Sequence, residues 1–475
     1  MGRTTAGLSA ICAAAIVALG CGGSSGAAPG SERGACFPNA TCDQGLTCLS
    51  NFCVRVDVDG ASGASGSAGA GGNAAGAGGV AGAGGTGGSS GGAATGGSTG
   101  GTFAPASHAP LPQLANLGGP VLATPKVRPI FFTGDPDQAD ISAFLSELAA
   151  GSYWAATTSE YGVGTLKLLP PVTGAGVTGP TLSDGALQAA LAANASSASA
   201  PWGAADASTI FLFVLPPGVG ITSGGAACCT DFGGYHDEAI VNGAAVPYAV
   251  VCTCPDFFGA GWTEVDERTV AMSHELVEAA TDPFPRSDPA FYAADTANLV
   301  WTLVTGGEVA DMCVVQPDTF IIPSGATHVF QRSWSNAAAK LGRDPCVPAS
   351  SPPYFAAMPV LDVIPYGTAG YKTHGLQIPI GSSRTIDLDL FSTGPVANGW
   401  NVGAYSYEDL LGGAPSLAFS LDKTTGRNGD ILRLTITAVR TNPTIGVDPF
   451  IIVSSTGSPG GSDYRSHVTM GLVTN

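Results

Sequence analysis

Three side chains within residues 272–283 have the types and the spacing needed to bind a metal ion and to activate a water molecule. His274 and Glu278 lie four residues apart, so that on a helix they project from one face. Glu275 follows His274 directly and is turned from it by about 100°. An imidazole and a carboxylate are common metal ligands, and a second carboxylate nearby can take a proton from water at the metal. We therefore predict that His274 and Glu278 bind a metal and that Glu275 is the catalytic base.

This spacing is that of the H-E-x-x-H helix of zinc peptidases, with Glu278 in place of the second histidine. Zinc is the cofactor that we expect. A glutamate ligand cancels one positive charge of the ion, which makes a bound water less acidic, and further oxygen ligands shift the preference toward calcium or manganese. The alternative is a structural amphipathic helix on which His274 is hydrogen-bonded and the glutamates face water.

The third ligand of this site is left open by the spacing. Asp282 lies eight residues after the histidine, and Glu308 and Asp311 lie about thirty residues downstream, as third carboxylate ligands do in some zinc peptidases. We favour Asp311, because Cys313 could hold its loop near the helix. His236 is the other choice, and otherwise we expect it to contact substrate. A catalytic site also requires these side chains to face a cleft.

The surrounding patterns predict a mixed α+β domain at residues 121–349. Thr263 and Asp266 have the spacing of a capping box, so we expect a zincin-like active-site helix over 264–281. Apolar runs and helical periodicity predict the neighbouring elements. These are strands at 127–132, 209–215, 238–241 and 245–251, the last two joined by an Asn-Gly turn, and helices at 137–150 and 187–193.

Residues 350–475 have a different pattern, which predicts an all-β sandwich. Short alternating apolar segments are separated by Gly, Pro and Asn turns, with no cysteine and no helical periodicity. We expect this domain to bind, space or protect rather than to catalyse. The expected strands are 359–364, 376–380, 385–391, 417–421, 431–439, 450–454 and 467–473.

The first 20 residues predict export. Arg3 precedes an apolar run at 8–19, which is too short to span a bilayer and has the length of a signal-peptide core. Small residues before Cys21 are typical of a lipoprotein cleavage site, so we expect a lipidated Cys21 and an outer-membrane or cell-surface lipoprotein; after ordinary cleavage the protein would be secreted. We assign residues 21–58 to the anchor region and a small cysteine-rich module, and residues 59–120 to a disordered Gly/Ala/Ser linker.

Cysteine use agrees with export, because disulfides persist in oxidising compartments. Apart from Cys12 in the signal peptide and Cys21, ten cysteines remain, in a group of four and a group of six. We expect two disulfides in the first group and three in the second, with a connectivity that the spacing does not reveal. A thiolate metal site is the alternative. The ten are Cys36, Cys42, Cys48, Cys53, Cys228, Cys229, Cys252, Cys254, Cys313 and Cys346.

Charge limits the classes of partner. The chain has 18 basic and 36 acidic residues and a net charge of -18. Such a chain is repelled by a phosphate backbone and by an anionic lipid surface. We therefore exclude nucleic acid as a partner and expect membrane contact only through the lipid anchor. An extracellular peptide or a cell-surface polymer is the partner that remains.

Residues 274–283 (HELVEAATDP), with 308–313 (EVADMC) and 331–336 (QRSWSN), resemble secreted bacterial HExxE metallopeptidase-like proteins. Three further segments (GGYH, CTCP and TDP) are similar to plant phosphate-induced, EXORDIUM-like extracellular proteins. The resemblance covers patches of residues 125–348. The first group implies a surface-tethered, zinc-dependent hydrolase that acts on peptides. The plant proteins lack the His-Glu pair and imply a non-catalytic protein that binds cell-wall or matrix polymer. A third reading is a metal-stabilised adhesin whose sandwich binds the partner.

Overall fold

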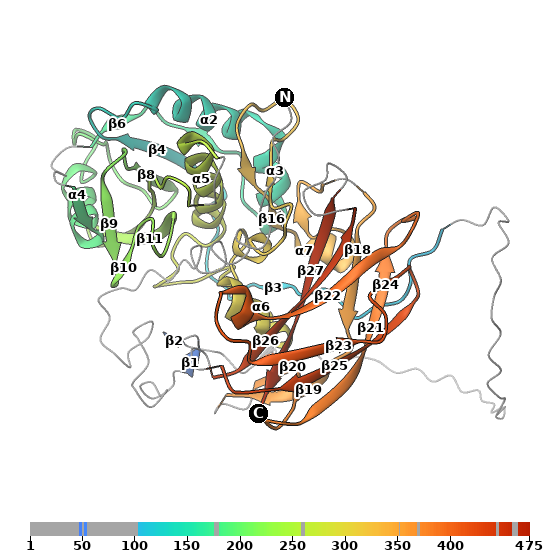
Figure 1. Ribbon diagram of the computed structural model, residues 1–475. Coiled ribbons are helices and arrows are strands. Elements are labelled where there is room, and N and C mark those ends of the chain that lie inside the picture. The colour runs from blue at the N-terminus through green and yellow to red at the C-terminus, as the bar shows by residue number, and fades with distance from the viewer. Residues whose placement is uncertain are drawn as a thin grey trace, which may run out of the picture.

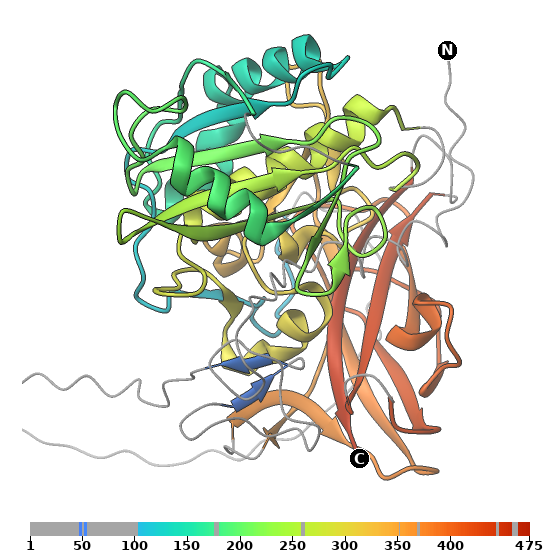
Figure 2. The same cartoon turned by 90° about the vertical axis from the view of Figure 1, so that its left-hand side faces the viewer.

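The computed structural model describes residues 103–174, 180–257, 262–350, 352–367, 371–442, 446–457 and 464–475, and the backbone at 47–49 and 52–54. The expected signal peptide, Cys21, the four-cysteine group as a disulfide module and most of the expected linker lie outside these residues. β1 (Thr47–Leu49) and β2 (Phe52–Val54) pair as antiparallel strands. The rest forms a helix-covered sheet beside a pair of curled sheets (Figure 1, Figure 2).

The first domain is built on one mixed sheet of order β11-β12-β8-β4-β5, with β6 also paired to β4. Strand β4 pairs in parallel with β5, β6 and β8, and β8 pairs in parallel with β12. Strands β11 and β12 form an antiparallel hairpin. At its turn Asn242 and Gly243 both have positive φ, at 52° and 82°, as a type I′ turn requires. The strands are β4 (Lys126–Phe131), β5 (Lys167–Leu168), β6 (Val172–Thr173), β8 (Thr209–Val214), β11 (Gly234–Val241) and β12 (Ala244–Val251).

Helices cover both faces of this sheet (Figure 1). All residues of β8 are buried, because alternate side chains enter two different cores. Ile210 and Leu212 pack in the core that contains α2, α3 and α5, whereas Phe211 and Phe213 pack in the core that contains α4. The helices of this domain are α2 (Gln138–Ala150), α3 (Ser152–Thr158), α4 (Asp184–Asn194), α5 (Glu264–Thr281), α6 (Leu299–Thr305) and α7 (Asn336–Lys340), with 3-10 turns η1 (Ser159–Tyr161), η2 (Thr296–Asn298) and η3 (Asp311–Cys313).

Helix α5 has the predicted bounds and the predicted start. The Thr263 hydroxyl accepts a hydrogen bond from the backbone N–H of Asp266 at 3.1 Å, and the Asp266 carboxylate accepts one from the N–H of Thr263 at 3.2 Å. Every residue from Glu267 to Thr281 is buried, so α5 is a core helix rather than a surface helix. The alternative of an amphipathic helix with its glutamates in water is therefore wrong.

Residues 103–120, which we expected to be the end of the linker, pack against the body instead. Leu111 and Leu114 are buried, and the His108 ring stacks on Phe391 with ring centroids 3.5 Å apart. Apolar side chains in this segment explain the correction, since the Gly/Ala/Ser composition ends before them. The minor strands here and in the loops are β3 (Leu114–Ala115) with β13 (Ala293–Ala294), β7 (Thr181–Ser183) with β9 (Gly220–Ser223) and β10 (Ala226–Ala227), β14 (Phe320–Ile321) with β15 (Phe330–Gln331), and β16 (Ser333–Trp334) with β17 (Cys346–Val347).

The described residues from Phe355 to Thr474 form a sandwich of two curled sheets, called the C-terminal sandwich below. One sheet has the order β18-β21-β25-β23 and the other β19-β20-β27-β26-β22-β24, and an apolar core lies between them. The strands are β18 (Phe355–Pro359), β19 (Asp362–Tyr366), β20 (Tyr371–Gln377), β21 (Ser383–Ser392), β22 (Trp400–Ser406), β23 (Leu417–Leu421), β24 (Thr425–Gly426), β25 (Ile431–Ala438), β26 (Asp448–Thr456) and β27 (Arg465–Thr474), with a short helix α8 (Tyr407–Leu410).

Several predictions for the C-terminal sandwich are wrong in detail. The strand expected at 376–380 is β20, which begins earlier, at Tyr371, and ends at Gln377. The single strand expected at 359–364 is two strands, because β18 ends at Pro359 and β19 begins at Asp362 in the opposite sheet. The chain turns the corner between the sheets over the two residues in between. Strand β22 was missed, since its alternation is interrupted by Gly403 and by the exposed Tyr405. Packing against β26 decides its state more than its own composition does.

The first domain and the C-terminal sandwich share one core. Ile451, Val468 and Met470 of the sandwich belong to the same apolar cluster as the buried face of α5. The side chain of Gln316 also bonds to both polar groups of the Val468 backbone, at 3.2 Å to the carbonyl and 2.9 Å from the N–H. The loop after η3 is thereby fixed to β27. Within the residues described above, no helix combines the length and the apolar composition of a membrane span.

Helix α5 is anchored by a buried ion pair, and this makes a testable prediction. Arg268 is fully buried and contacts Asp135 at 2.5 Å and Asp137 at 3.0 Å. Replacing it in Arg268→Ala leaves Asp135 buried without its partner, so we expect urea unfolding to show a loss of about 3–5 kcal/mol. The matched control is Lys126→Ala, which breaks the half-exposed Lys126–Asp206 pair and should change stability by about 0–1 kcal/mol. Equal effects of the two substitutions would contradict the anchoring role.

Candidate metal centre

Six ionisable side chains, one of them on β11, lie close together in the interior and are called the buried cluster below. They come from β11, from α5, from the loop before η3 and from η3 itself. None of the six is more than 3% exposed, and the three on α5 are fully buried. Groups so deeply buried must be paired, protonated or bound to a cation. The cluster consists of His236, His274, Glu275, Glu278, Glu308 and Asp311.

The structure brings together the three ligands that the spacing favoured. His274 Nε2 lies 3.0 Å from Glu278 Oε2 and 3.4 Å from Asp311 Oδ1. One ligand atom from each of the three residues lies within 4.8 Å of the others. Zinc bonds of about 2 Å in a tetrahedral arrangement place ligand atoms roughly 3.3 Å apart. The donor set and the spacing therefore fit a divalent metal ion.

Glu278 is held in place by the loop that carries Asp311. Its Oε1 accepts hydrogen bonds from the backbone N–H groups of Ala310, at 3.1 Å, and Asp311, at 3.0 Å. Its Oε2 remains on the side of the two histidines. Hydrogen bonds of this kind orient a ligating carboxylate before any metal arrives.

Glu275 and His236 lie on the other side of Glu278. His236 Nδ1 is 3.6 Å from Glu275 Oε2 and 3.7 Å from Glu278 Oε2, and His236 Nε2 is 3.8 Å from Glu308 Oε1. His236 is thus part of the cluster rather than a residue on an open surface. Asp282, one of the third-ligand alternatives, is the C-cap of α5, and its Oδ1 accepts a hydrogen bond from the Ala290 N–H at 2.7 Å.

Two glycines that the sequence analysis did not assign to the site make room for its carboxylates. A methyl group at Gly306 would collide with Oδ2 of Asp311, and Gly306 has a positive φ of 101°. A methyl group at Gly234 would lie 2.9 Å from Cγ and 3.0 Å from Oε1 of Glu275. The two sequence pairs Gly233-Gly234 and Gly306-Gly307 were the available signal, since adjacent glycines mark close approach of a backbone.

Burial and mutual charge shift the pKa values of the cluster in opposite directions. Burial, reinforced by the charge of Glu278, raises the pKa of Glu308 and of Asp311 well above the usual range. Burial disfavours the imidazolium of His274, but Glu278 and Glu275 outweigh it and raise the pKa of His274 to about 10. Against burial, His274 in turn lowers the pKa of Glu278 to about 2. Protons therefore sit where a cation would sit, and metal binding must displace them.

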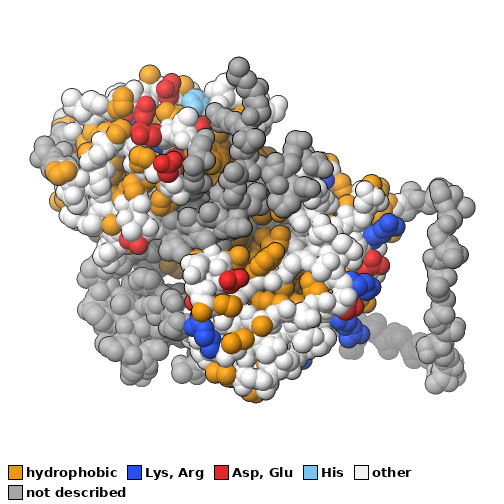
Figure 3. All heavy atoms as spheres, in the orientation of Figure 1, with side chains coloured by type: hydrophobic (Ala, Val, Ile, Leu, Met, Phe, Trp, Pro, Cys, Tyr) orange, Lys and Arg blue, Asp and Glu red, His pale blue; other side chains and the backbone are white. Residues whose placement is uncertain are grey.

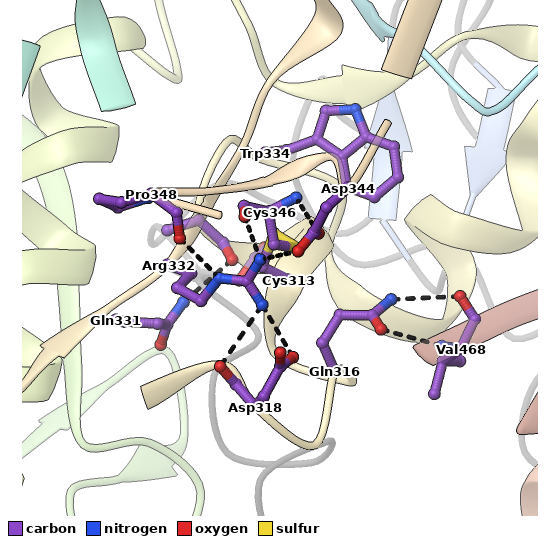
Figure 4. Close-up of a disulfide and its surroundings, with 12 residues drawn as sticks. Cys313, Gln316, Asp318, Gln331, Arg332, Trp334, Asp344, Cys346, Pro348 and Val468 are labelled. Carbon is purple, nitrogen blue, oxygen red and sulfur yellow. Dashed lines mark hydrogen bonds and ion pairs between the residues drawn. A yellow bond between two sulfur atoms is a disulfide. The ribbon is translucent and has the colours of Figure 1, made fainter. Parts of the chain in front are cut away.

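A disulfide and an arginine support the loop that carries Asp311 (Figure 4). Cys313 of η3 is bonded to Cys346 of β17, so the disulfide ties this loop to β17 rather than to the helix itself. Arg332 fills the space beside it, bonding to Asp318 at 2.8 Å, to the Pro348 carbonyl at 3.0 Å and to Asp344. Asp318 and Asp344 lie near enough to His467 to hold a cation, and Arg332 already forms an ion pair with each of them.

The segment 331–336 links α5 to η3 directly. The Gln331 backbone N–H donates to the Ser273 hydroxyl at 2.9 Å, and the Gln331 amide donates to the Ala310 carbonyl at 3.0 Å. Trp334 adds a hydrogen bond from its backbone N–H to the Val309 carbonyl at 2.7 Å. Residues 331–336 thus hold the segments 274–283 and 308–313 in position relative to each other.

The three disulfides expected in the second cysteine group are present, and the structure supplies their connectivity. Cys228 is bonded to Cys252 and Cys229 to Cys254, in addition to Cys313–Cys346. All six sulfurs lie in these bridges, which favours disulfides over the thiolate metal site, although Cys228, Cys229 and Cys254 also lie close enough together to hold an ion. The first two bridges join the segment before β11 to the segment after β12, and so fix the end of the hairpin near His236.

The expected cleft over His274 and Glu278 is not present among the described residues. Both side chains are fully buried, beneath the sheet on one side and the loops around η3 on the other. Figure 3 shows a surface in which uncharged side chains dominate, with scattered acidic and basic groups. The cluster is therefore a closed, strongly polar centre within an apolar core.

Comparisons with known proteins leave the chain without a family. No family model matches the sequence, and no curated protein matches it. The S-layer protein SbsC, in a crystal structure of domains 4 and 5, is 17% identical over 25% of this chain and 54% of that chain, with a TM-score of 0.14. A structure of surface layer protein SbsC, domains 1-6, is 17% identical over 24% of this chain and 13% of that chain, also with a TM-score of 0.14.

The close approach of Gly306 to Asp311 predicts the effect of adding one methyl group. We expect Gly306→Ala to displace the Asp311 carboxylate and to weaken zinc binding by about 10–100-fold in isothermal titration. Gly325→Ala is the matched control, because Gly325 also has a positive φ, 84°, but has open space around it. A Gly306→Ala protein with the zinc affinity of the control would show that Asp311 is not a ligand.

Proposed function

We propose that this chain is an exported, surface-tethered, zinc-dependent hydrolase that acts on extracellular peptides. His274, Glu278 and Asp311 would hold the zinc ion, and Glu275 would be the general base. The observation that carries this proposal is the convergence of the three ligand atoms within 4.8 Å. Two of their mutual distances, 3.0 Å from His274 to Glu278 and 3.4 Å from His274 to Asp311, match those of zinc ligands.

The roles of the residues follow from where they lie. A bound zinc ion polarises a carbonyl group and acidifies water. Glu275 lies on the same helix, one residue from His274, and its carboxylate reaches His236 at 3.6 Å. It would take a proton from water and return it to the leaving amine. His236 would orient Glu275 and could donate to a substrate carbonyl.

Export and the lipid anchor belong to the same proposal. The supporting observation is the set of three disulfides within the described residues, since such bonds form and persist outside a reducing cytosol. The apolar run at 8–19 would be the core of the export signal, and Cys21 would carry the lipid anchor. The linker would then hold the body away from the membrane surface.

Catalysis at this site requires access, and access requires movement. The three residues on α5 are fully buried, so a peptide reaches Glu275 only if the loops over the cluster open. The loop before η3 is the element whose opening would uncover Glu278 and Asp311, although its disulfide at Cys313 restricts the amplitude.

The catalytic role separates from metal binding in two isosteric variants. We expect Glu275→Gln to retain zinc and to lower peptide turnover by at least about 100-fold, because only the base is lost. Asp311→Asn should lose both zinc and turnover. Glu264→Gln, at the exposed start of the same helix, is the control and should behave as wild type. Metal analysis and casein or peptide turnover measure the two effects. Wild-type turnover in Glu275→Gln would remove Glu275 from its role.

A second candidate function is non-catalytic binding of a cell-wall or matrix polymer by the C-terminal sandwich. Two observations favour it: the closed metal centre, and a cavity of about 450 Å³ in the sandwich. Amide and guanidinium groups line this cavity, and they are suitable donors for sugar hydroxyls. Its lining includes Asn398, Trp400, Asn401, Thr425 and Arg465. In this case the metal would only stabilise the fold.

The second function predicts a different set of results. Zinc would raise the melting temperature without any peptide turnover, and the protein would sediment with insoluble cell-wall polymer. Asn401→Ala should then reduce the bound fraction several-fold, since it removes an exposed cavity donor without touching the metal centre. Asn194→Ala is the control, because Asn194 lies on α4 and outside the cavity. Asn336 is not suitable, since its side chain supports β3. Unchanged sedimentation of Asn401→Ala would remove the cavity from this role.

A further inference from the structure

We propose that the buried cluster binds two divalent cations rather than one, and that Glu278 is the ligand shared between them. The first ion would lie between His274, Glu278 and Asp311, as proposed above. The second would lie between His236, Glu278 and Glu308. This inference rests on the proposed function, because the two sites have Glu278 in common, and it adds a metal site that His236 and Glu308 complete.

The second site has the same kind of geometry as the first. One ligand atom from each of His236, Glu278 and Glu308 lies within 4.8 Å of the other two. His236 Nδ1 is 3.7 Å from Glu278 Oε2, and His236 Nε2 is 3.8 Å from Glu308 Oε1. These distances are too long for hydrogen bonds, which lie near 2.7–3.2 Å. Each is close to the separation of two atoms that ligate one metal ion; the two distances start from different ring nitrogens of His236, so the ion would bind only one of them.

Polar atoms of His236 and Glu308 are buried without a direct hydrogen bond among the described residues. These atoms are both ring nitrogens of the imidazole and both oxygens of the carboxylate. His236 is 3% exposed and Glu308 is 2% exposed, so both side chains are shielded from bulk solvent. A buried imidazole and a buried carboxylate that face each other without bonding need a ligand between them. A cation supplies one bond to each.

Glu278 is placed to serve both sites at once. Its Oε2 lies 3.0 Å from His274 Nε2 on one side and 3.7 Å from His236 Nδ1 on the other. Its Oε1 is fixed by the Ala310 and Asp311 amides, which sets the direction of Oε2. One oxygen between two imidazoles from different elements is the arrangement of a bridging carboxylate.

The charge of the cluster favours two ions over one. Glu275, Glu278, Glu308 and Asp311 carry four negative charges when ionised, and the two imidazoles are neutral when they ligate a metal. With all four carboxylates ionised, one divalent ion balances two of the four negative charges, whereas two divalent ions balance all four. Asp282 adds a fifth charge nearby, and the hydrogen bond from the Ala290 amide offsets part of it. Buried charge without compensation is strongly unfavourable, so the second cation completes the balance.

A second ion would also resolve a chemical weakness of the first site. Two carboxylate ligands cancel most of the charge of a single zinc ion, which reduces its power to acidify water. A neighbouring ion restores positive charge at the same place, and paired ions of this kind are used by several classes of hydrolase. Zinc and manganese both suit a ligand set of imidazoles and carboxylates.

Metal stoichiometry tests the proposal directly. The full chain is equilibrated with zinc chloride alone, freed of excess metal and analysed by plasma mass spectrometry. We expect two zinc ions per wild-type chain and one per Glu308→Gln chain. Glu408→Gln is the matched control, a buried glutamate in the C-terminal sandwich, and should retain two. One ion in wild type, kept in Glu308→Gln and lost in Asp311→Asn, overturns the two-ion centre while leaving the proposed hydrolase site intact.

Manganese provides a measurement that does not depend on the stoichiometry. Two Mn²⁺ ions that share a carboxylate oxygen are magnetically coupled, so the fully loaded wild type should lack the isolated six-line electron paramagnetic resonance spectrum. Glu308→Gln loaded in the same way should show the isolated spectrum. An isolated spectrum in fully loaded wild type refutes the shared ligand. If wild type binds neither metal, both the two-ion centre and the proposed function fail together.

Discussion

The rest of the structure depends on the contacts that the buried carboxylate of Glu278 makes. One of its oxygens closes the turn at η3 through the Ala310 and Asp311 amides, and the other lies between His274 and His236. A carboxylate in the interior needs positive charge close to it, and no position on α5 provides that charge except the histidine one turn earlier. The fold is arranged so that four chain segments meet at this one group.

The surrounding structure holds these segments by apolar packing, a disulfide and hydrogen bonds, together with the buried ion pairs of Arg268 and Arg332. Helix α5 is buried along Glu267–Thr281, so its orientation is set by packing against the sheet and the loops. The Cys313–Cys346 disulfide and Gln331 hold η3 against it, and Gln316 carries the same support into β27. A rigid shell of this kind keeps the carboxylates together in spite of their mutual repulsion, which is the condition for selective metal binding.

The closed position of the cluster connects its two functional interpretations. A metal ion can reach such a centre through small fluctuations, whereas a peptide needs a larger opening of the loops. If the proposed ion binds among these buried charges, it would stabilise the fold whether or not the protein catalyses a reaction. Stability and any catalysis therefore depend on the same residues, and only turnover distinguishes the two functions.

The sequence by itself determined the local features. The capping box at Thr263, the bounds of α5, the Asn242-Gly243 hairpin and the same-face placement of His274 and Glu278 all follow from short-range periodicity and turn chemistry. The approach of Asp311 was predictable because Cys313 stands two residues after it. The roles of His236, Glu308 and the two glycines were decided only by the tertiary structure, as were the burial of the cluster and the corner between β18 and β19. These features depend on how a hairpin, a helix and a loop pack together across more than seventy residues of sequence, and local patterns do not encode that packing.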